Sequence, residues 1–303
     1  MDTLSSKYFK NSNDDIFKID IVLDNDPINP REDNESVYHM MCWNKRYNLG
    51  DRHNYDTPTN FFKAKIEENK AISKLIDFVK DGKTSNNLEI NHNESSGKYE
   101  LIAEYTLWSS KEPHTQKGIV AEAVSPEDLY EDIVDILPYT DFIKILEEIG
   151  FVFLPLSIYD HSGITMYIGS SSDHYDGQWD CSEVGWIYTT KTEIVDELKI
   201  PEDEWEKYAD EGLRWDVKYY DLYLRGDVYG YQVYKLNKED MSAHVYTLED
   251  IKNNPTLESL FFEEYDACYG YATDDIDTLL DETIHHDFSA TEVYDTIYDI
   301  KEN

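Results

Sequence analysis

Residues 151–158, FVFLPLSI, form a continuous apolar run with the length of one β-strand. The run begins after Gly150 and ends before the polar sequence Tyr159-Asp160-His161-Ser162-Gly163, so turn-forming residues bound it on both sides. Short apolar runs bounded in this way are typical of strands that are buried on both faces. We therefore predict a central buried strand here, although Pro155 removes one backbone donor from it.

Alternating and helical patterns surround this strand. Strands are predicted where apolar residues alternate, at residues 16–23, 37–43, 88–91, 99–107, 164–168, 184–189 and 228–236. Helices are predicted where apolar residues recur at helical spacing, at residues 62–79 after an N-cap at Thr59, at 125–137, at 140–150, after Thr192, and at 201–225 with a break at Gly212. Because strands and helices do not alternate regularly, the predicted class is α+β, with a mixed, largely antiparallel sheet and flanking helices.

The sequence suggests three segments. Residues 1–36 form a polar N-terminal segment with one strand, and residues 37–240 form an α+β core domain. Residues 241–303 form an acidic, mainly helical C-terminal region. Within it, one helix would bury Ile276, Leu279, Leu280 and Ile284, and a second would begin at Ser289.

The charge of the chain restricts its function. The 303 residues carry 64 acidic and 27 basic side chains, a net charge of −37, yet the hydrophobic fraction is 40% and the aromatic fraction 14%. Acidic disordered chains lack such apolar content, so a folded core is expected. Direct binding to nucleic acid or to an anionic membrane needs clustered Lys and Arg, so the composition favours a basic protein partner instead.

Cysteine content and hydropathy bear on the compartment. Cys42, Cys181 and Cys268 are odd in number and widely spaced, which indicates neither a disulfide framework nor a zinc site and favours a reducing cytoplasm. No apolar run approaches the ~18 residues of a membrane-spanning helix. The N-terminal residues also lack the pattern of a signal peptide.

The acidic side chains of the C-terminal region are the candidate site. Residues 240–303 contain 17 acidic and two basic side chains, whereas residues 43–83 contain six acidic and nine basic ones. Ordinary surfaces mix the two signs, so this imbalance favours a purposeful anionic surface over a solvated helix face. The predicted partner-binding residues are Asp274, Asp275, Asp277, Asp281, Glu282, Asp287 and Glu292.

Two other groups of residues have competing interpretations. His161, with Asp173, His174, Asp176 and Asp180, could ligate a metal in a hydrolase, but Asp160 and Ser162 beside Gly163 are also typical of a turn. The aromatic group Trp205, Trp215, Tyr219, Tyr220 and Tyr223 is expected in the core, with a partner-facing patch as the alternative. We predict the turn and the core, and therefore no catalytic residue, metal or cofactor.

Several segments together resemble one protein family. The segment from Cys42 to Asp51 resembles the "CW-x-x-RYNLGD" signature of a family of phage and mobile-element proteins, usually left uncharacterised. The segment Leu154–Gly163 resembles its "LPLxLYDHSG" sequence, and Val184–Tyr188 matches its "VGWIY" sequence. The match departs at Cys181-Ser182-Glu183, where the family usually has Ser-Gly-Gln, and the whole resemblance spans roughly residues 37–272.

The resemblance implies a viral or mobile-element setting, in the host cytoplasm. Combined with the charge, it predicts a non-enzymatic inhibitor of a nucleic-acid-directed defence system, of the restriction or CRISPR type, that acts as an acidic nucleic-acid mimic. Its partner would be a basic host nucleic-acid-binding protein or defence nuclease complex, and a homo-oligomer stays open. The alternatives are a defence-protein binder with an aromatic patch and a metal-dependent hydrolase.

Overall fold

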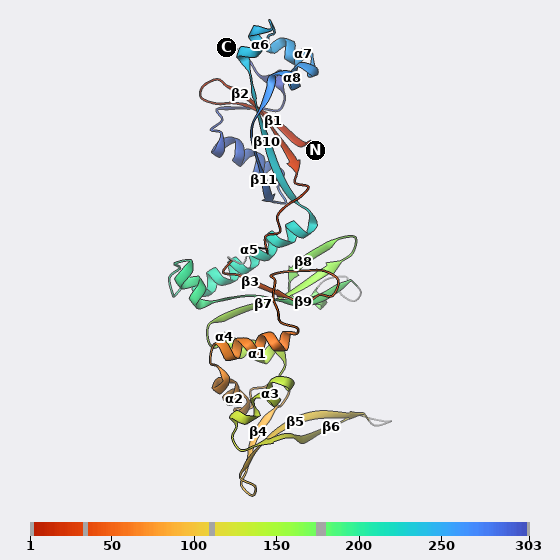
Figure 1. Ribbon diagram of the computed structural model, residues 1–303, viewed down its shortest axis with the longest axis vertical. Helices are drawn as coiled ribbons and strands as arrows, with labels where there is room; N and C mark the ends of the chain where they lie inside the picture. The colour runs from red at the N-terminus through yellow and green to blue at the C-terminus, as the bar shows by residue number, and fades with distance from the viewer. Residues whose placement is uncertain (1–2, 33–35, 109–112, 174–179, 302–303) are drawn as a thin grey trace. The chain divides into compact units, whose positions relative to one another are not determined.

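The computed structural model describes residues 3–32, 36–108, 113–173 and 180–301 (Figure 1). Helices accompany strands whose described pairings are all antiparallel, which confirms the α+β class. The strands form three sheets of five, four and three strands, where one sheet was predicted. No helix in the described ranges has the length and apolarity needed to cross a membrane.

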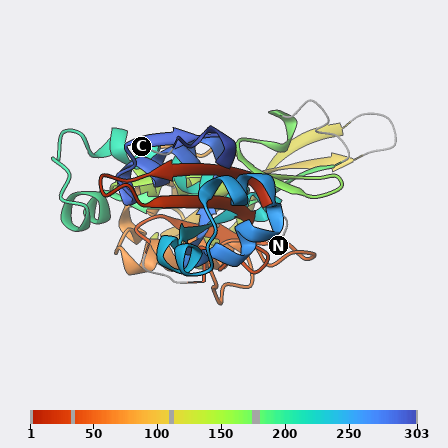
Figure 2. The ribbon, with the colours of Figure 1, turned by 90° about the horizontal axis from the view of Figure 1, so that it is seen from above.

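The chain divides into two compact units. Unit 1 comprises Met1–Glu32, Asp160–Met166 and Lys218–Asn303, and unit 2 comprises Asp33–Tyr159 and Tyr167–Val217. This division differs from the three predicted segments, because the N-terminal residues pair with strands from the C-terminal part of the chain. Figures 1 and 2 show the red N-terminal strands beside the blue C-terminal elements. Long-range strand pairing leaves no local pattern in the sequence, so it could not be predicted.

Unit 1 is built on the five-stranded sheet. Its strand order is β11 (Phe262–Ala272), β10 (Val228–Leu236), β2 (Ile16–Leu23), β1 (Thr3–Lys10) and β12 (Glu292–Tyr294). Neighbouring residues of β2 point to opposite faces, so Phe17 and Ile16 contribute to two separate cores. One face is covered by α9 (Ile276–Glu282) and the π-helix η4 (Thr283–Asp287), and the other by α6 (Lys238–Ala243), α7 (Leu248–Asn253) and α8 (Pro255–Phe261).

Unit 2 contains the strand that the apolar run predicted. β7 (Phe151–Asp160) lies inside the four-stranded sheet, in the order β3 (His39–Cys42), β9 (Cys181–Thr190), β7 and β8 (Ile164–Ile168), which confirms the central strand. The three-stranded sheet contains β4 (Glu89–Asn93), β5 (Lys98–Trp108) and β6 (Pro113–Ala123). One hydrophobic core joins residues of these two sheets to residues of four helices, which are α1 (Pro58–Glu68), α2 (Ile72–Lys80), α3 (Tyr130–Ile136) and α4 (Tyr139–Glu147).

The signature segments of the sequence meet at one place in unit 2. Cys42 of β3 pairs with Gly185 of β9, and the Trp43 backbone N–H donates to the Val184 carbonyl oxygen at 2.7 Å. The indole rings of Trp43 and Trp186 pack edge to face, with centroids 6.2 Å apart. The Asp51 carboxylate accepts from the Met40 backbone N–H at 2.8 Å, which ties the loop back to β3. These contacts give the segments a structural role.

Two helix boundaries differ from the prediction. The N-cap of α1 is Thr57, whose hydroxyl accepts from the Asn60 backbone N–H, and not Thr59. The predicted helix over residues 62–79 is two helices, because Lys70 has a φ of 55°, in the left-handed region. Conversely, α5 (Trp205–Arg225) runs through Gly212 without a break. A Cβ atom at that glycine would lie 1.9 Å from the Tyr38 hydroxyl, so the glycine permits close approach.

The C-terminal region is less helical than predicted. Residues 262–272 form the edge strand β11, and the helix predicted from Ser289 is wrong, because residues 292–294 form β12 and a 3₁₀ turn follows at Ile297–Asp299. Strands β1 and β6 were not predicted either. β6 and β11 are edge strands, which bury little of either face, so their sequences need not alternate. β1 lies between β2 and β12, but its first five residues are exposed or half-buried and its last three are all buried, so it shows no clear alternation either.

Asp141 is a buried carboxylate of unit 2 that we expect to stabilise the fold. The Asp141 side chain has no exposed area and accepts from the Ser85 N–H at 2.7 Å, from the Ser85 hydroxyl at 2.9 Å and from Lys144 Nζ at 2.8 Å. Replacing Asp141 by Ala leaves the Ser85 donors unpaired, so we expect the free energy of unfolding to fall by about 2–4 kcal/mol. Urea unfolding measures this, with Asp135→Ala at an exposed position as the control; equal losses would contradict it.

Candidate partner-binding surface

The acidic segment after β11 is fixed to the sheet of unit 1. Asp275 is the N-cap of α9, and its carboxylate accepts from the Thr278 backbone N–H at 3.0 Å and from the Thr278 hydroxyl at 2.7 Å. These hydrogen bonds lower the pKa of Asp275. Leu280 and Ile284 are buried in the core beneath the segment. The apolar side of the segment is therefore anchored, and its acidic residues are exposed.

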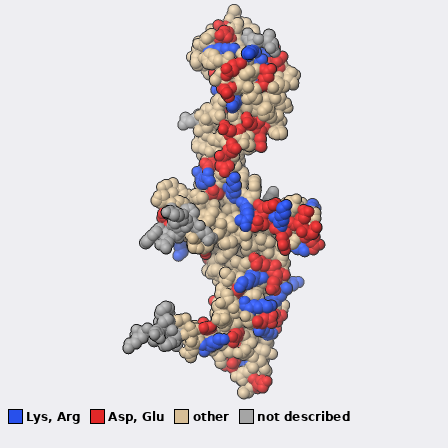
Figure 3. All heavy atoms as spheres, turned by 180° about the vertical axis from the view of Figure 1, so that it is seen from behind, with Lys and Arg blue, Asp and Glu red and all other residues tan. Residues whose placement is uncertain are grey.

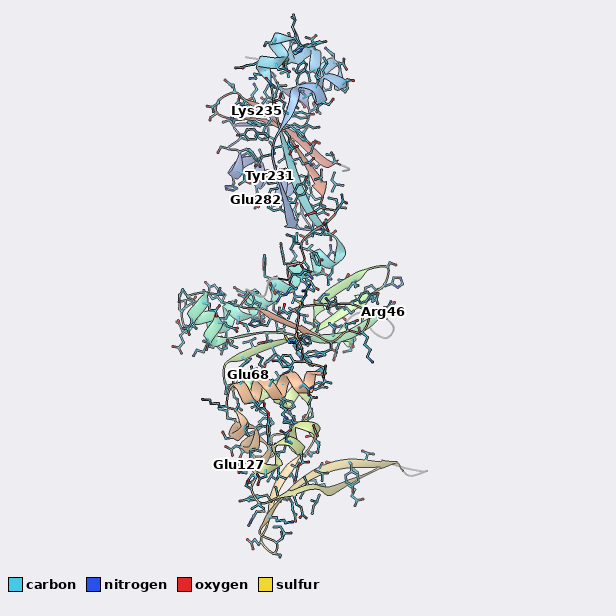
Figure 4. The ribbon with its side chains drawn as sticks, in the orientation of Figure 1. Arg46, Glu68, Glu127, Tyr231, Lys235 and Glu282 are labelled. Atoms are coloured by element: carbon cyan, nitrogen blue, oxygen red, sulfur yellow. The ribbon has the colours of Figure 1, made fainter. Side chains whose placement is uncertain are left out.

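All seven predicted partner-binding carboxylates belong to exposed residues. Asp274 pairs with Lys218 at 3.2 Å and, among the described residues, is the only one of the seven with a basic nitrogen within 4.0 Å. Glu282 is the last residue of α9. Figure 4 labels both Glu282 and Tyr231, and Tyr231 belongs to the sheet that α9 covers. Asp287 ends η4, and Glu292 begins β12 on the sheet edge. The seven thus lie in one stretch of chain, two of them directly before α9 and five of them on α9, η4 and β12.

Lys7 of β1 brings part of this set together. Its Nζ lies 2.6 Å from an Asp295 carboxylate oxygen, and this hydrogen bond raises the pKa of Lys7, with the charges of Asp281 and Asp277 adding to the effect. Asp277 and Asp281 are four residues apart on α9 and so share one helix side. Asp295 was not selected from the sequence, although it follows Glu292 by three residues. The long-range pair with Lys7 gives no sequence signal.

The negative charge extends beyond the predicted region. Unit 1 holds 28 acidic and 10 basic side chains, and unit 2 holds 36 and 17, so both units are strongly acidic. On the face that Figure 3 draws, red acidic side chains lie over both units. The negative charge is therefore densest in residues 240–303 but is not confined to them. Within unit 1, exposed acids also come from the edge strand β11, at Glu263, Glu264 and Asp266.

The structure describes only part of the proposed metal cluster, namely His161 and Asp180. His161 lies in a turn, where its backbone N–H donates to the Gly163 carbonyl oxygen at 3.1 Å and Ser162 has a φ of 64°. His174 and Asp176 lie outside the described residues, as do the side-chain surroundings of Asp173. In the part of the chain that the structure describes, no three His, Cys, Asp or Glu side chains are grouped to hold a metal.

The aromatic group is only partly in the core. Tyr220 is 1% exposed, as predicted, but Trp215 is 63% exposed and Tyr219 and Tyr223 are half-buried. The two half-buried tyrosines are four residues apart on α5, so they lie on the same side of the helix. The expectation of core packing therefore holds for Tyr220 and is wrong for Trp215.

A second polar cluster lies in unit 2. His39 Nε2 lies 2.6 Å from a Glu193 carboxylate oxygen, and the other oxygen accepts from the Thr190 N–H and hydroxyl at 2.8 and 2.7 Å. The His39 and Tyr188 rings have centroids 5.0 Å apart, and burial raises the pKa of Tyr188 to about 12. These residues were not singled out from the sequence. The cluster therefore has a histidine oriented by a carboxylate.

This pair gives a prediction for pH. Burial raises the pKa of Glu193, but hydrogen bonds with His39 and Thr190 outweigh it and leave the pKa below its usual value. A depressed folded-state pKa stabilises the protein above the unfolded pKa, and the stabilisation disappears as pH falls through the folded value. We expect Glu193→Gln to lower the free energy of unfolding by about 1 kcal/mol at pH 7 and by less at pH 3, measured by urea unfolding. A difference that grows on acidification would contradict this.

Comparison with protein-family models, with curated proteins and with solved structures returned no match for this chain.

Proposed function

We propose that the protein is a non-enzymatic inhibitor that occupies the basic nucleic-acid-binding groove of a host defence protein. The observation that carries this proposal is the set of seven exposed carboxylates on the anchored α9, η4 and β12 segment of unit 1. Carboxylates are anionic at neutral pH. They can stand in for the phosphates of a polynucleotide in front of a cationic receptor.

The scarcity of neutralising side chains supports the proposal. In unit 1, 28 acidic side chains face 10 basic ones, and several of the basic side chains already have acidic partners, such as Lys235 with Asp15 and Arg225 with Asp227. A surplus of like charge destabilises the compact state through self-repulsion. The surplus of negative charge on this well-packed sheet is explained if its electrostatic field attracts the basic partner.

The fixed display of the charges is the second support. Leu279, Leu280 and Ile284 are buried under the acidic segment, so its backbone is held by the core. A pre-ordered array loses less conformational freedom on binding than an acidic tail does. The resemblance to phage and mobile-element proteins adds the setting, in which the partner would be a restriction or CRISPR-type complex.

The test is competition with DNA. The full chain is titrated into a purified type I restriction complex and a fluorescent DNA duplex that carries its site, and release of the duplex is measured. We expect displacement that weakens by at least about tenfold in affinity between 50 and 200 mM salt, because screening reduces the attraction between opposite charges. Retention of the duplex by this complex and by a Cas9–guide complex would overturn the proposal for both classes of target.

A further inference from the structure

Unit 1 contains a cavity that none of the seven predicted partner-binding residues lines. It has a volume of about 570 Å³ and lies between the loop after β2, the last turns of α5, and the facing ends of β10 and β11. Every residue that lines it belongs to unit 1. Three of the lining residues are tyrosines, Tyr219, Tyr223 and Tyr269, and two are acidic, Asp24 and Asp26. Cavities of this size, with apolar walls and a few polar groups, are typical of ligand sites.

The tyrosine rings are held in place. The Tyr219 hydroxyl donates to the Gly270 carbonyl oxygen at 3.4 Å, and Gln232 Nε2 donates to the Tyr269 hydroxyl at 2.7 Å. The Tyr223 ring stacks on buried Tyr220, with centroids 6.0 Å apart and an interplanar angle of 13°. Fixed rings can present their faces to a ligand with little loss of side-chain freedom. Their faces carry partial negative charge and attract cations.

The lining selects for positive charge. An Asp24 carboxylate oxygen accepts from the Asp26 backbone N–H at 3.1 Å, and the Asp24 N–H donates to the Val228 carbonyl oxygen at 2.9 Å, so the first carboxylate is fixed at the wall. Among the described residues that line the cavity, none is basic. Two carboxylates would repel a phosphate or carboxylate ligand and would pair with a cation. The combination of tyrosine faces and carboxylates therefore fits a cationic group.

We infer that this cavity is a socket for an arginine side chain of the basic partner. The guanidinium group is planar, stacks on aromatic faces and donates in a fork to a carboxylate, whereas the lysine ammonium is a compact, strongly hydrated charge. The cavity offers both stacking faces and carboxylates. The inference deepens the proposed function, on which the choice of partner rests, and it concerns none of the seven carboxylates, which do not line the cavity.

The experiment uses the full chain with ¹³C-labelled tyrosine rings. The probes are the capped tripeptide acetyl-Gly-Arg-Gly-amide and its citrulline counterpart, which is neutral and of nearly the same shape. We expect the arginine peptide to shift the Tyr219 and Tyr223 signals in a saturable way and the citrulline peptide to bind at least about fivefold more weakly. Equal binding of the two peptides, or shifts confined to tyrosines elsewhere, would overturn the socket.

Matched variants sharpen the test. Tyr223→Phe keeps the ring face and should retain the affinity for the arginine peptide within about twofold, whereas Tyr223→Leu should lose about fivefold or more. Tyr298→Leu, at a residue that is 60% exposed in the same unit, should leave binding unchanged. Wild-type affinity in a folded Tyr223→Leu protein would contradict the inference.

Failure of the socket is distinguishable from failure of the proposed function. The variant with all seven carboxylates neutralised should still bind the arginine peptide, because Asp24 and Asp26 are intact. If the peptide does not bind while this variant loses the competition with DNA, the socket alone is refuted. If the peptide binds and the wild-type chain does not displace the duplex, the partner assignment is refuted.

Discussion

Neutralising the seven carboxylates before and along the α9, η4 and β12 segment is expected to weaken competition with DNA by at least about tenfold. The variant carries Asp→Asn at 274, 275, 277, 281 and 287 and Glu→Gln at 282 and 292. Exposed charge pairs contribute about 0.2–1 kcal/mol each, so the loss of seven predicts at least about a tenfold drop in affinity. The change should preserve the fold, because Asn is as good an N-cap as the Asp275 that it replaces. Duplex displacement at 50 mM salt measures the effect.

The control variant removes the same charge from unit 2. It neutralises seven exposed acids, which are Asp56, Asp77, Glu94, Glu127, Asp132, Asp135 and Glu148. If the segment of unit 1 makes the contacts, this control should lose much less affinity than the first variant. Equal losses would show that total charge attracts the partner and would refute the assignment of the seven. Unchanged affinity in the first variant would also refute it.

The largest loss of stability is expected for Gly185→Ala in β9. Gly185 has a φ of 156°, and a Cβ atom there would lie 1.9 Å from the Met41 carbonyl oxygen of β3. That oxygen belongs to the backbone of the paired strand, so it cannot rotate away and the two strands must separate. We expect the free energy of unfolding to fall by more than about 3 kcal/mol, measured by urea unfolding.

Gly82→Ala provides the matched control in the same unit. Gly82 has a φ of 66°, and nothing lies within 4 Å of a Cβ atom placed there. Only the backbone conformation then opposes the alanine, which costs about 1–2 kcal/mol. A loss at Gly185 no larger than the loss at Gly82 would contradict the close approach of β3 and β9. The comparison therefore separates backbone strain from interstrand contact.

Much of the fold could be predicted where one segment carries its own pattern. Residues 16–23, 164–168 and 228–236 are strands within the predicted bounds, and the apolar run at 151–158 is an interior strand. Strands β1, β6 and β11 were missed. Pairing with β2 and β12 determines the conformation of β1. The sequence of β1 alone does not predict that pairing.

The candidate site was only partly accessible from the sequence. The seven acids could be selected because basic side chains are scarce around them, and all seven residues are exposed. Their association with Lys7 and Asp295, some 288 residues apart in the chain, depends on strand pairing. The tyrosine and aspartate cavity likewise joins residues 24–30 to residues 219–272. Such contacts follow from topology, which residue spacing does not encode.

By itself, the sequence determined the α+β class, the apolar strand of unit 2 and the strong negative charge of the whole chain. These properties follow from composition and from periodic patterns among residues that are close together in the sequence. Only the tertiary structure decided that the N-terminal strands complete the sheet beneath the acidic segment, that both units share the negative charge, and that three tyrosines and two aspartates line one cavity. The reason is physical: β-sheets and cavities are made by contacts between residues far apart in the chain, and their free energy belongs to the assembled fold.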